Sequence, residues 1–189
     1  MRPVVLLMTV AALMVTTPSM AQRLDPSALP SIGATAPAFG LEAFRTRGEE
    51  DSARAVVQLD DHCGVRPGDT STVLVTFVNN VNAVDDLKTL NQWMRKYSRD
   101  GFEAVVISTE SDPTAMSELA AKTRGTFAML DDQFGIVARR YGISSAPFSL
   151  LLDRECHVLG MSDKSITVDA DRLEASLDER SKAARSARK

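Results

Sequence analysis

Cysteine and histidine are scarce in this chain of 189 residues, which has two of each. Neither a C-x₂-C pair nor an H-x₃-H pair occurs, so the usual spacing of a zinc site is missing. The chain also has no Gly-rich phosphate-binding loop and no serine-centred nucleophile motif. Several common kinds of catalytic and cofactor site are therefore excluded by sequence alone.

Basic residues are also in the minority, with 22 Lys and Arg against 25 Asp and Glu and a formal net charge of −3. A mildly acidic chain lacks the basic surface of a nucleic-acid-binding protein, so we expect no nucleic-acid partner. The exception is the C-terminal "RSKAARSARK", whose bases suit anionic lipid or an acidic protein. Because charged termini are usually solvated and frayed, residues 179–189 are predicted to be a basic disordered tail.

The first 21 residues have the pattern of a secretory signal peptide. Arg2 gives a positive start, an apolar run follows from Val4 to Val15, and Ser19-Met20-Ala21 has the small residues of a cleavage site. The apolar run is too short to span a bilayer. We therefore predict an exported protein, periplasmic or secreted, with an extended lead-in over residues 22–35.

Strand and helix patterns alternate along the rest of the chain. Residues 72–78 and 103–108 read as buried strands, separated by a helix whose apolar face runs from Val84 to Tyr97. Residues 148–153 and 156–160 read as a hairpin, and residues 168–182 as a closing helix. The pattern predicts an α/β sandwich with a mixed sheet, in which strands 72–78 and 103–108 are parallel neighbours.

Several of these segments together resemble a known family. They are "GATAPAFGL", "VLVTF", "GFEAVVIST" and "MLDDQFGIVARRYGISSAPFSLLLDRECHV", and they resemble a thioredoxin-fold redoxin. The similar types are the alkyl hydroperoxide reductase/thiol-specific antioxidant proteins and the exported thiol–disulfide oxidoreductases. The resemblance implies a thioredoxin-like three-layer sandwich over residues 36–178. It also implies a cis peptide bond between Ala146 and Pro147, beside the family's active site.

The same resemblance shows that the family's reactive cysteines are missing. Counting from the aromatic residue of the central strand, the two cysteine positions hold Asn82 and Asp85. Asn82 suits the N-cap of the following helix, and Asp85 suits the third residue of a capping box. These residue types predict a stable helix start in place of a reactive thiol. Asn79, Asn80 and Asn82 would also give a polar groove beside Pro147, where relatives hold a peptide.

Each cysteine adjoins a histidine, in His62-Cys63 and Cys156-His157, and three interpretations remain open. The resemblance places both cysteines at the end of the sheet away from the family's active site. An even cysteine count in an oxidising compartment favours a structural disulfide between them. The four residues also have donor types that suit zinc or copper, although adjacent residues point in different directions on a strand. The third interpretation is a relocated redox-active pair.

We expect a non-catalytic module that binds a protein or peptide partner in the cell envelope, with no cofactor. The alternatives are a divergent thiol–disulfide or antioxidant oxidoreductase acting through Cys63 and Cys156, and a metal carrier using His62, Cys63, Cys156 and His157. An enzyme of this type would be a thiol–disulfide or peroxide oxidoreductase. Membrane contact is expected at most through the basic tail.

Overall fold

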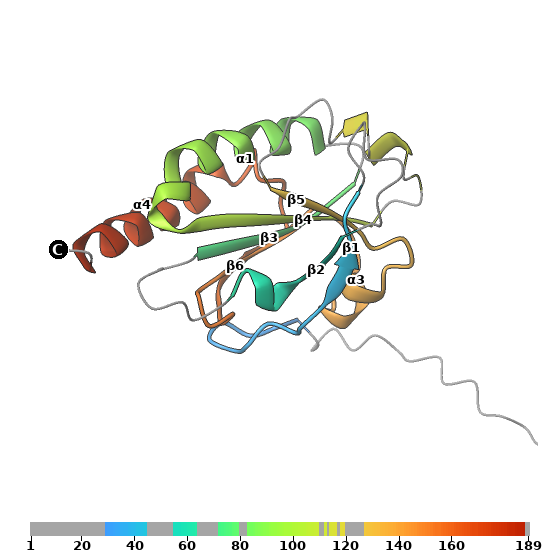
Figure 1. The fold of residues 1–189 in the computed structure, drawn as a ribbon, viewed down its shortest axis with the longest axis horizontal. Helices are drawn as coiled ribbons and strands as arrows, with labels where there is room; N and C mark the ends of the chain where they lie inside the picture. The colour runs from blue at the N-terminus through green and yellow to red at the C-terminus, as the bar shows by residue number, and fades with distance from the viewer. Residues whose placement is uncertain are drawn as a thin grey trace, which may run out of the picture.

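The structure is a computed structural model of the protein (Figure 1). The structure describes residues 29–44, 55–63, 72–79, 83–109, 112, 114–116, 118–119 and 127–187. The predicted signal peptide, Asn80 and Asn82 lie outside the described residues. None of the helices in the described part of the chain combines the length and hydrophobicity that a membrane span requires.

The described elements alternate between strands and helices, as the sequence pattern predicts. The strands are β1 (Gly40–Glu42), β2 (Val56–Gln58), β3 (Thr72–Val78), β4 (Phe102–Ser108), β5 (Ala128–Asp131), β6 (Phe148–Leu152) and β7 (Val158–Ser162). The helices are η2 (Leu59–Asp61), α1 (Ala83–Tyr97), η3 (Ser98–Asp100), α3 (Ile136–Arg140) and α4 (Ala170–Ala187).

Five strands form a mixed sheet in the order β5-β4-β3-β6-β7. β3 is parallel to β4, and β4 is parallel to β5, whereas β6 runs antiparallel to both β3 and β7. The helix α1 connects β3 to β4, as a parallel pair requires. β1 and β2 form a separate antiparallel pair. The predicted α/β fold class and the parallel neighbours are confirmed.

The sheet is covered on both faces, which explains the near-continuous apolar runs of its central strands. Side chains of β3 alternate between the two faces, so Leu74 and Val78 join one buried cluster while Val73, Val75 and Phe77 join the other. The first cluster packs against α1 and α4, and the second against α3 and the N-terminal segment. Figure 1 shows these helices on opposite sides of the sheet.

The C-terminal segment differs from the prediction, because residues 179–187 are helical and not a disordered tail. α4 continues to Ala187, and both Ser181 and Ala184 are buried. Asp100 holds this end of the helix by accepting a hydrogen bond from the Ser181 hydroxyl and pairing with Arg185 at 3.3 Å. The bases of the segment therefore face outward from a docked helix, an arrangement that net composition alone does not reveal.

Carboxylates of α4 tie it to the C-terminal end of α1. Lys96 Nζ lies 2.8 Å from Glu174 Oε1 and 3.3 Å from Asp178 Oδ1, and the Tyr97 hydroxyl donates to Asp178 at 2.7 Å. The Lys96 ammonium lowers the pKa of the Glu174 carboxyl, while the Tyr97 hydroxyl and Lys96 lower the pKa of Asp178. Desolvation raises the pKa of Tyr97 to about 12, so its hydroxyl stays a donor at neutral pH.

These lowered pKa values predict that the contacts between α4 and the end of α1 weaken at acidic pH. The ordinary pKa values are 4.5 for Glu174 and 3.8 for Asp178, and both are lower in the folded state. Their stabilising contribution is therefore complete above the ordinary values and is lost as the pH falls through the folded values. We expect the melting temperature to fall as the pH is lowered from about 5 through the ordinary pKa values and below them, with a shallower fall in Lys96→Gln. Thermal unfolding across this range measures both slopes.

Lys88→Gln is the matched control, because Lys88 lies on the same helix and, among the residues that the structure describes, pairs only with the exposed Asp85. It should leave the pH dependence close to that of the unsubstituted protein. Equal slopes in the Lys96→Gln and unsubstituted proteins would contradict this account of the network.

Candidate functional site

The joint between β3 and α1 is the position at which the resemblance implies a reactive cysteine. β3 ends at Val78, and α1 begins at Ala83, which is buried. The side-chain amide of Asn79 donates to the carbonyl oxygen of Ala146 at 3.0 Å. The Ala146–Pro147 peptide is cis, as expected. One hydrogen bond thus joins the end of the central strand to the cis-proline loop.

Asp85 occupies the first turn of α1 and points into solvent. Its side chain is 74% exposed and pairs with Lys88 at 3.0 Å. An acidic residue in the first turn interacts favourably with the helix dipole. Whether Asp85 also completes a capping box with Asn82 stays a prediction, because Asn82 lies outside the described residues. No thiol is available at either position, since the sequence has Asn and Asp there.

A shallow pocket of about 280 Å³ lies next to the cis-proline loop. Its lining combines small, polar and apolar side chains, from the end of β4, from α3 and from the loop after it: Thr109, Gly135, Ala138, Arg139, Ile143, Ser144, Ser145 and Ala146. Such a lining suits a polar or extended ligand better than a deep apolar one.

Asp132 fixes the position of α3. Its two carboxylate oxygens accept the backbone N–H groups of Val137 at 3.2 Å and Ala138 at 2.9 Å. Asp132 is 2% exposed, so these bonds are shielded from water. On the other side of α3, the buried Tyr141 hydroxyl donates to Pro37 O at 2.6 Å. Burial raises the pKa of Tyr141, which keeps its hydroxyl protonated.

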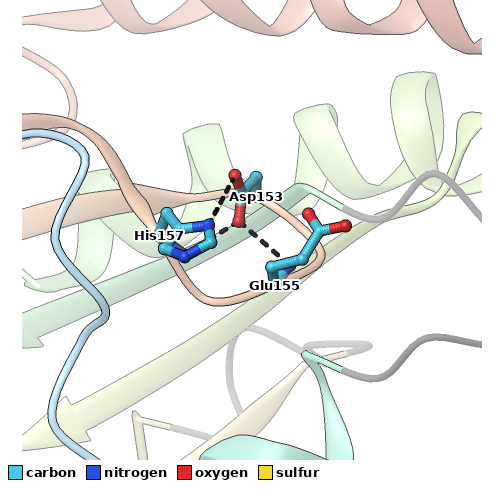
Figure 2. Close-up of side chains that lie close together, drawn as sticks. All are labelled: Asp153, Glu155 and His157. Carbon is cyan, nitrogen blue, oxygen red and sulfur yellow. Dashed lines mark hydrogen bonds and ion pairs between the residues drawn. The ribbon is translucent and has the colours of Figure 1, made fainter.

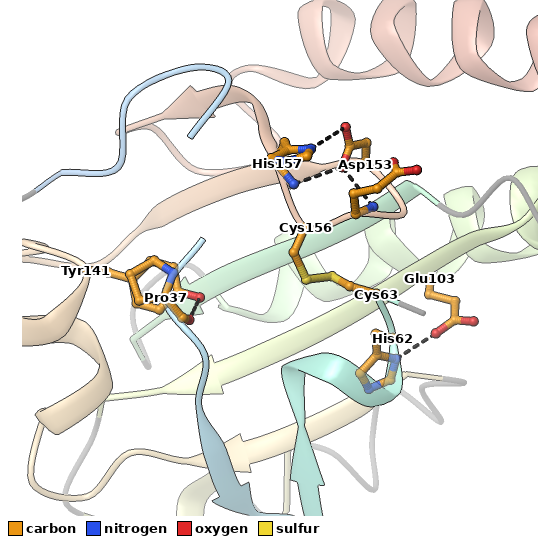
Figure 3. The surroundings of a disulfide bond; sticks show 9 residues. Pro37, His62, Cys63, Glu103, Tyr141, Asp153, Cys156 and His157 are labelled. Carbon is orange, nitrogen blue, oxygen red and sulfur yellow. Dashed lines mark hydrogen bonds and ion pairs between the residues drawn. A yellow bond between two sulfur atoms is a disulfide. The ribbon is translucent and has the colours of Figure 1, made fainter. Parts of the chain in front are cut away.

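The two cysteines form a disulfide, which confirms the expected pairing of Cys63 with Cys156. Their Cα atoms are 5.3 Å apart, and the bond closes a loop across a sequence separation of 93 residues. Figure 3 shows the bond joining the segment after η2 to the turn between β6 and β7. No free cysteine is left.

The disulfide lies at the opposite end of the sheet from the cis-proline loop. Cys156 is in the turn that follows Leu152, which pairs with Val73 near the start of β3. The cis-proline precedes Phe148, which pairs with Phe77 near the end of β3. β3 has seven residues, and at roughly 3.3 Å per residue it separates the two ends by about 20 Å.

The Cys₂His₂ metal set, one of the three interpretations of the cysteine–histidine pairs, is not assembled in the structure. Its two sulfur atoms are bonded to each other, so neither cysteine offers a thiolate. The two imidazoles interact with different carboxylates: His62 Nδ1 lies 2.6 Å from Glu103 Oε2, and His157 Nδ1 lies 3.4 Å from Asp153 Oδ2. The formation of the disulfide is the physical reason for this correction.

Sequence reasoning missed both carboxylate partners of the histidines. Glu103 is the one exposed residue of β4, and it is separated from its partner His62 by 41 residues in the sequence. Asp153 is closer, four residues before His157, and its carboxylate also accepts the backbone N–H groups of Glu155 and His157. The spacing D-x-E-x-H over residues 153–157 is the signal that could have identified the second partner.

Comparisons with known proteins give similarity only at the level of structure. No protein-family model matches the sequence, and no curated protein matches it. A candidate thiol:disulfide interchange protein DsbE from Chlorobium tepidum superimposes with a TM-score of 0.68 at 24% identity, covering 80% of this chain and 99% of that one.

Two proteins from Mycobacterium tuberculosis are also similar in structure. The peroxidoxin BcpB has a TM-score of 0.64 at 17% identity, covering 79% of this chain and 97% of that one. A secreted disulfide oxidoreductase homologous to E. coli DsbE has a TM-score of 0.53 at 16% identity, covering 67% and 83%. Together with the sheet order and the cis-proline, these likenesses show that the chain has a thioredoxin-like fold.

Proposed function

We propose that this protein is an exported binding module that uses the thioredoxin fold without thiol chemistry at the start of α1. The observation that carries the proposal is the placement of the cysteines. Both are joined in a disulfide about 20 Å from the cis-proline loop, by the rise of β3. The start of α1 has an acidic residue in its first turn, which would oppose a neighbouring thiolate.

The binding surface in this proposal is the pocket beside the cis-proline loop. It offers exposed serine hydroxyls at Ser144 and Ser145 and the exposed side chain of Arg139. An extended protein segment could place backbone groups against such a lining, so a protein or peptide of the cell envelope is the partner class. Export is supported by the signal-peptide pattern of residues 1–21 and by the disulfide, which persists in oxidising compartments.

Activity assays test the absence of thiol chemistry directly. We expect the purified protein neither to accelerate insulin reduction by dithiothreitol nor to consume peroxide with a thiol donor. Asn82→Cys/Asp85→Cys restores the two thiols at the family positions and should gain measurable insulin reduction, because a thiol at a helix N-terminus is activated.

Two outcomes would contradict the proposal. Activity of the unsubstituted protein that disappears in Cys63→Ala would place catalysis at the disulfide. A double variant that stays folded, forms its new dithiol and gains no activity would mean that the missing thiols do not explain the inactivity.

One observation favours a second candidate, an oxidoreductase acting through Cys63 and Cys156. Each cysteine adjoins a histidine that is paired with a carboxylate, and such a carboxylate can orient the imidazole beside a thiolate (Figure 3). In that reaction the disulfide would accept two electrons and two protons from an external dithiol, which would itself become a disulfide. The burial of Cys156, at 6% exposure, is the argument against easy attack on its sulfur.

A further inference from the structure

The turn between β6 and β7 gathers three metal-ligating side chains on one side. Asp153, Glu155 and His157 alternate along the turn, and one ligand atom of each lies within 4.8 Å of the other two. Figure 2 shows the imidazole and the two carboxylates around the same turn. This cluster shares only His157 with the cysteine–histidine set considered from the sequence.

Asp153 is held in place while one of its oxygens stays directed at the histidine. Its Oδ1 accepts the backbone N–H groups of Glu155 at 2.9 Å and His157 at 2.8 Å. Its Oδ2 lies 3.4 Å from His157 Nδ1, longer than a well-formed N–H···O hydrogen bond. Two ligands of a tetrahedral zinc ion, each at 2.0–2.1 Å from the metal, are about 3.3 Å apart. The pair therefore has the spacing of two metal ligands.

The backbone that carries these ligands is fixed by contacts on both sides. Cys156, in the middle of the turn, has a left-handed φ of 61° and is bonded to Cys63. Its carbonyl accepts the N–H of Ala36, and His157 forms an isolated bridge with Thr35. A turn restrained in this way loses little further conformational freedom when its side chains bind an ion.

Arg154 is the competing cation for Glu155. Its Nε lies 2.6 Å from Glu155 Oε1, and the two side chains are 43% and 39% exposed. Exposed pairs of this kind contribute little to stability, so exchanging Arg154 for a divalent ion costs little. The ion would bring two positive charges to the two carboxylates, whereas arginine brings one.

We propose that Asp153, Glu155 and His157 form a binding site for a divalent transition-metal ion, with water completing the coordination. An imidazole beside two carboxylates suits zinc or a similar ion, whereas magnesium and calcium favour sites made of oxygen alone. Because both cysteines are in the disulfide, the site needs no thiolate and exists in the oxidised protein.

Isothermal titration of the oxidised protein with zinc chloride, without reductant, tests this site. We expect one zinc ion per chain. Glu155→Gln and His157→Asn should each weaken zinc binding by roughly 10–100-fold, because even the loss of a residue that only hydrogen-bonds to a metal ligand has an effect of this size. Arg154→Ala removes the competing cation and should tighten binding. His62→Asn is the matched control, since it removes the other imidazole, which lies beside Glu103.

Thermal unfolding gives an independent readout that does not rely on heats of binding. Zinc should raise the melting temperature of the unsubstituted and His62→Asn proteins in a concentration-dependent way, and should not raise that of His157→Asn. The proposal is overturned if the unsubstituted protein shows no saturable binding, if His157→Asn binds as tightly, or if His62→Asn loses the ion.

Discussion

Cys63→Ala is expected to lower the free energy of unfolding by about 4–5 kcal/mol in the chain-entropy model of a disulfide. The bond links positions 93 residues apart, and a loop of that size greatly restricts the unfolded chain. For a domain of this length the melting temperature should fall on the order of 10–20 °C. Denaturant and thermal unfolding of the oxidised proteins measure the difference.

The control for this prediction is a second way to remove the same bond. The free energy of unfolding of Cys63→Ala/Cys156→Ala should lie within about 2 kcal/mol of that of the single variant. The second substitution adds only the small cavity left by one buried sulfur atom. Reduction of the unsubstituted protein should have a similar effect. A single variant with unchanged stability would show that the disulfide does not hold the β6–β7 turn against the rest of the fold.

Asp132→Ala is expected to cost about 2–4 kcal/mol, the second largest effect. The change leaves the N–H groups of Val137 and Ala138 without their buried, charged acceptor. α3 has only five residues, so it has little helical stability of its own to compensate. Urea unfolding measures the loss, and Gln133→Ala, at the exposed neighbouring position, is the control.

Asp132→Asn adds a graded test, because the amide keeps one acceptor oxygen and loses the charge. Its stability should fall between those of the unsubstituted protein and Asp132→Ala. The wall of the pocket beside the cis-proline loop comes partly from α3, through Ala138 and Arg139. If Asp132→Ala were as stable as Gln133→Ala, Asp132 would not be the residue that positions that wall.

The sequence was sufficient to predict the sheet, because each central strand is covered on both faces and therefore reads as an apolar run. The disulfide followed from the resemblance, which placed Cys63 and Cys156 at one end of the sheet. Contacts between exposed polar residues were not predictable. His62 and Glu103 are 41 residues apart in the sequence, and they pair because the loop that carries His62 lies beside β4 in the fold. A local sequence pattern does not contain that information.

Two boundary errors have local physical causes. The second strand of the hairpin was predicted from Cys156 but begins at Val158, because Asp153 accepts backbone N–H groups of the turn and Cys156 adopts a left-handed conformation. The C-terminal segment was predicted to fray because of its charge. It is helical to Ala187 because Ser181 and Ala184 are buried and the Ser181 hydroxyl donates a hydrogen bond to Asp100.

The central claim is that the disulfide is structural and that the protein therefore has no thiol chemistry of its own. The most direct test is to equilibrate the folded protein in glutathione redox buffers, trap free thiols by alkylation and count them by mass spectrometry. The account predicts that Cys63 and Cys156 stay bonded across the range of the glutathione pool, as structural disulfides do. A bond that opens and closes near the potential of an oxidising compartment would contradict it and would make the disulfide the active site.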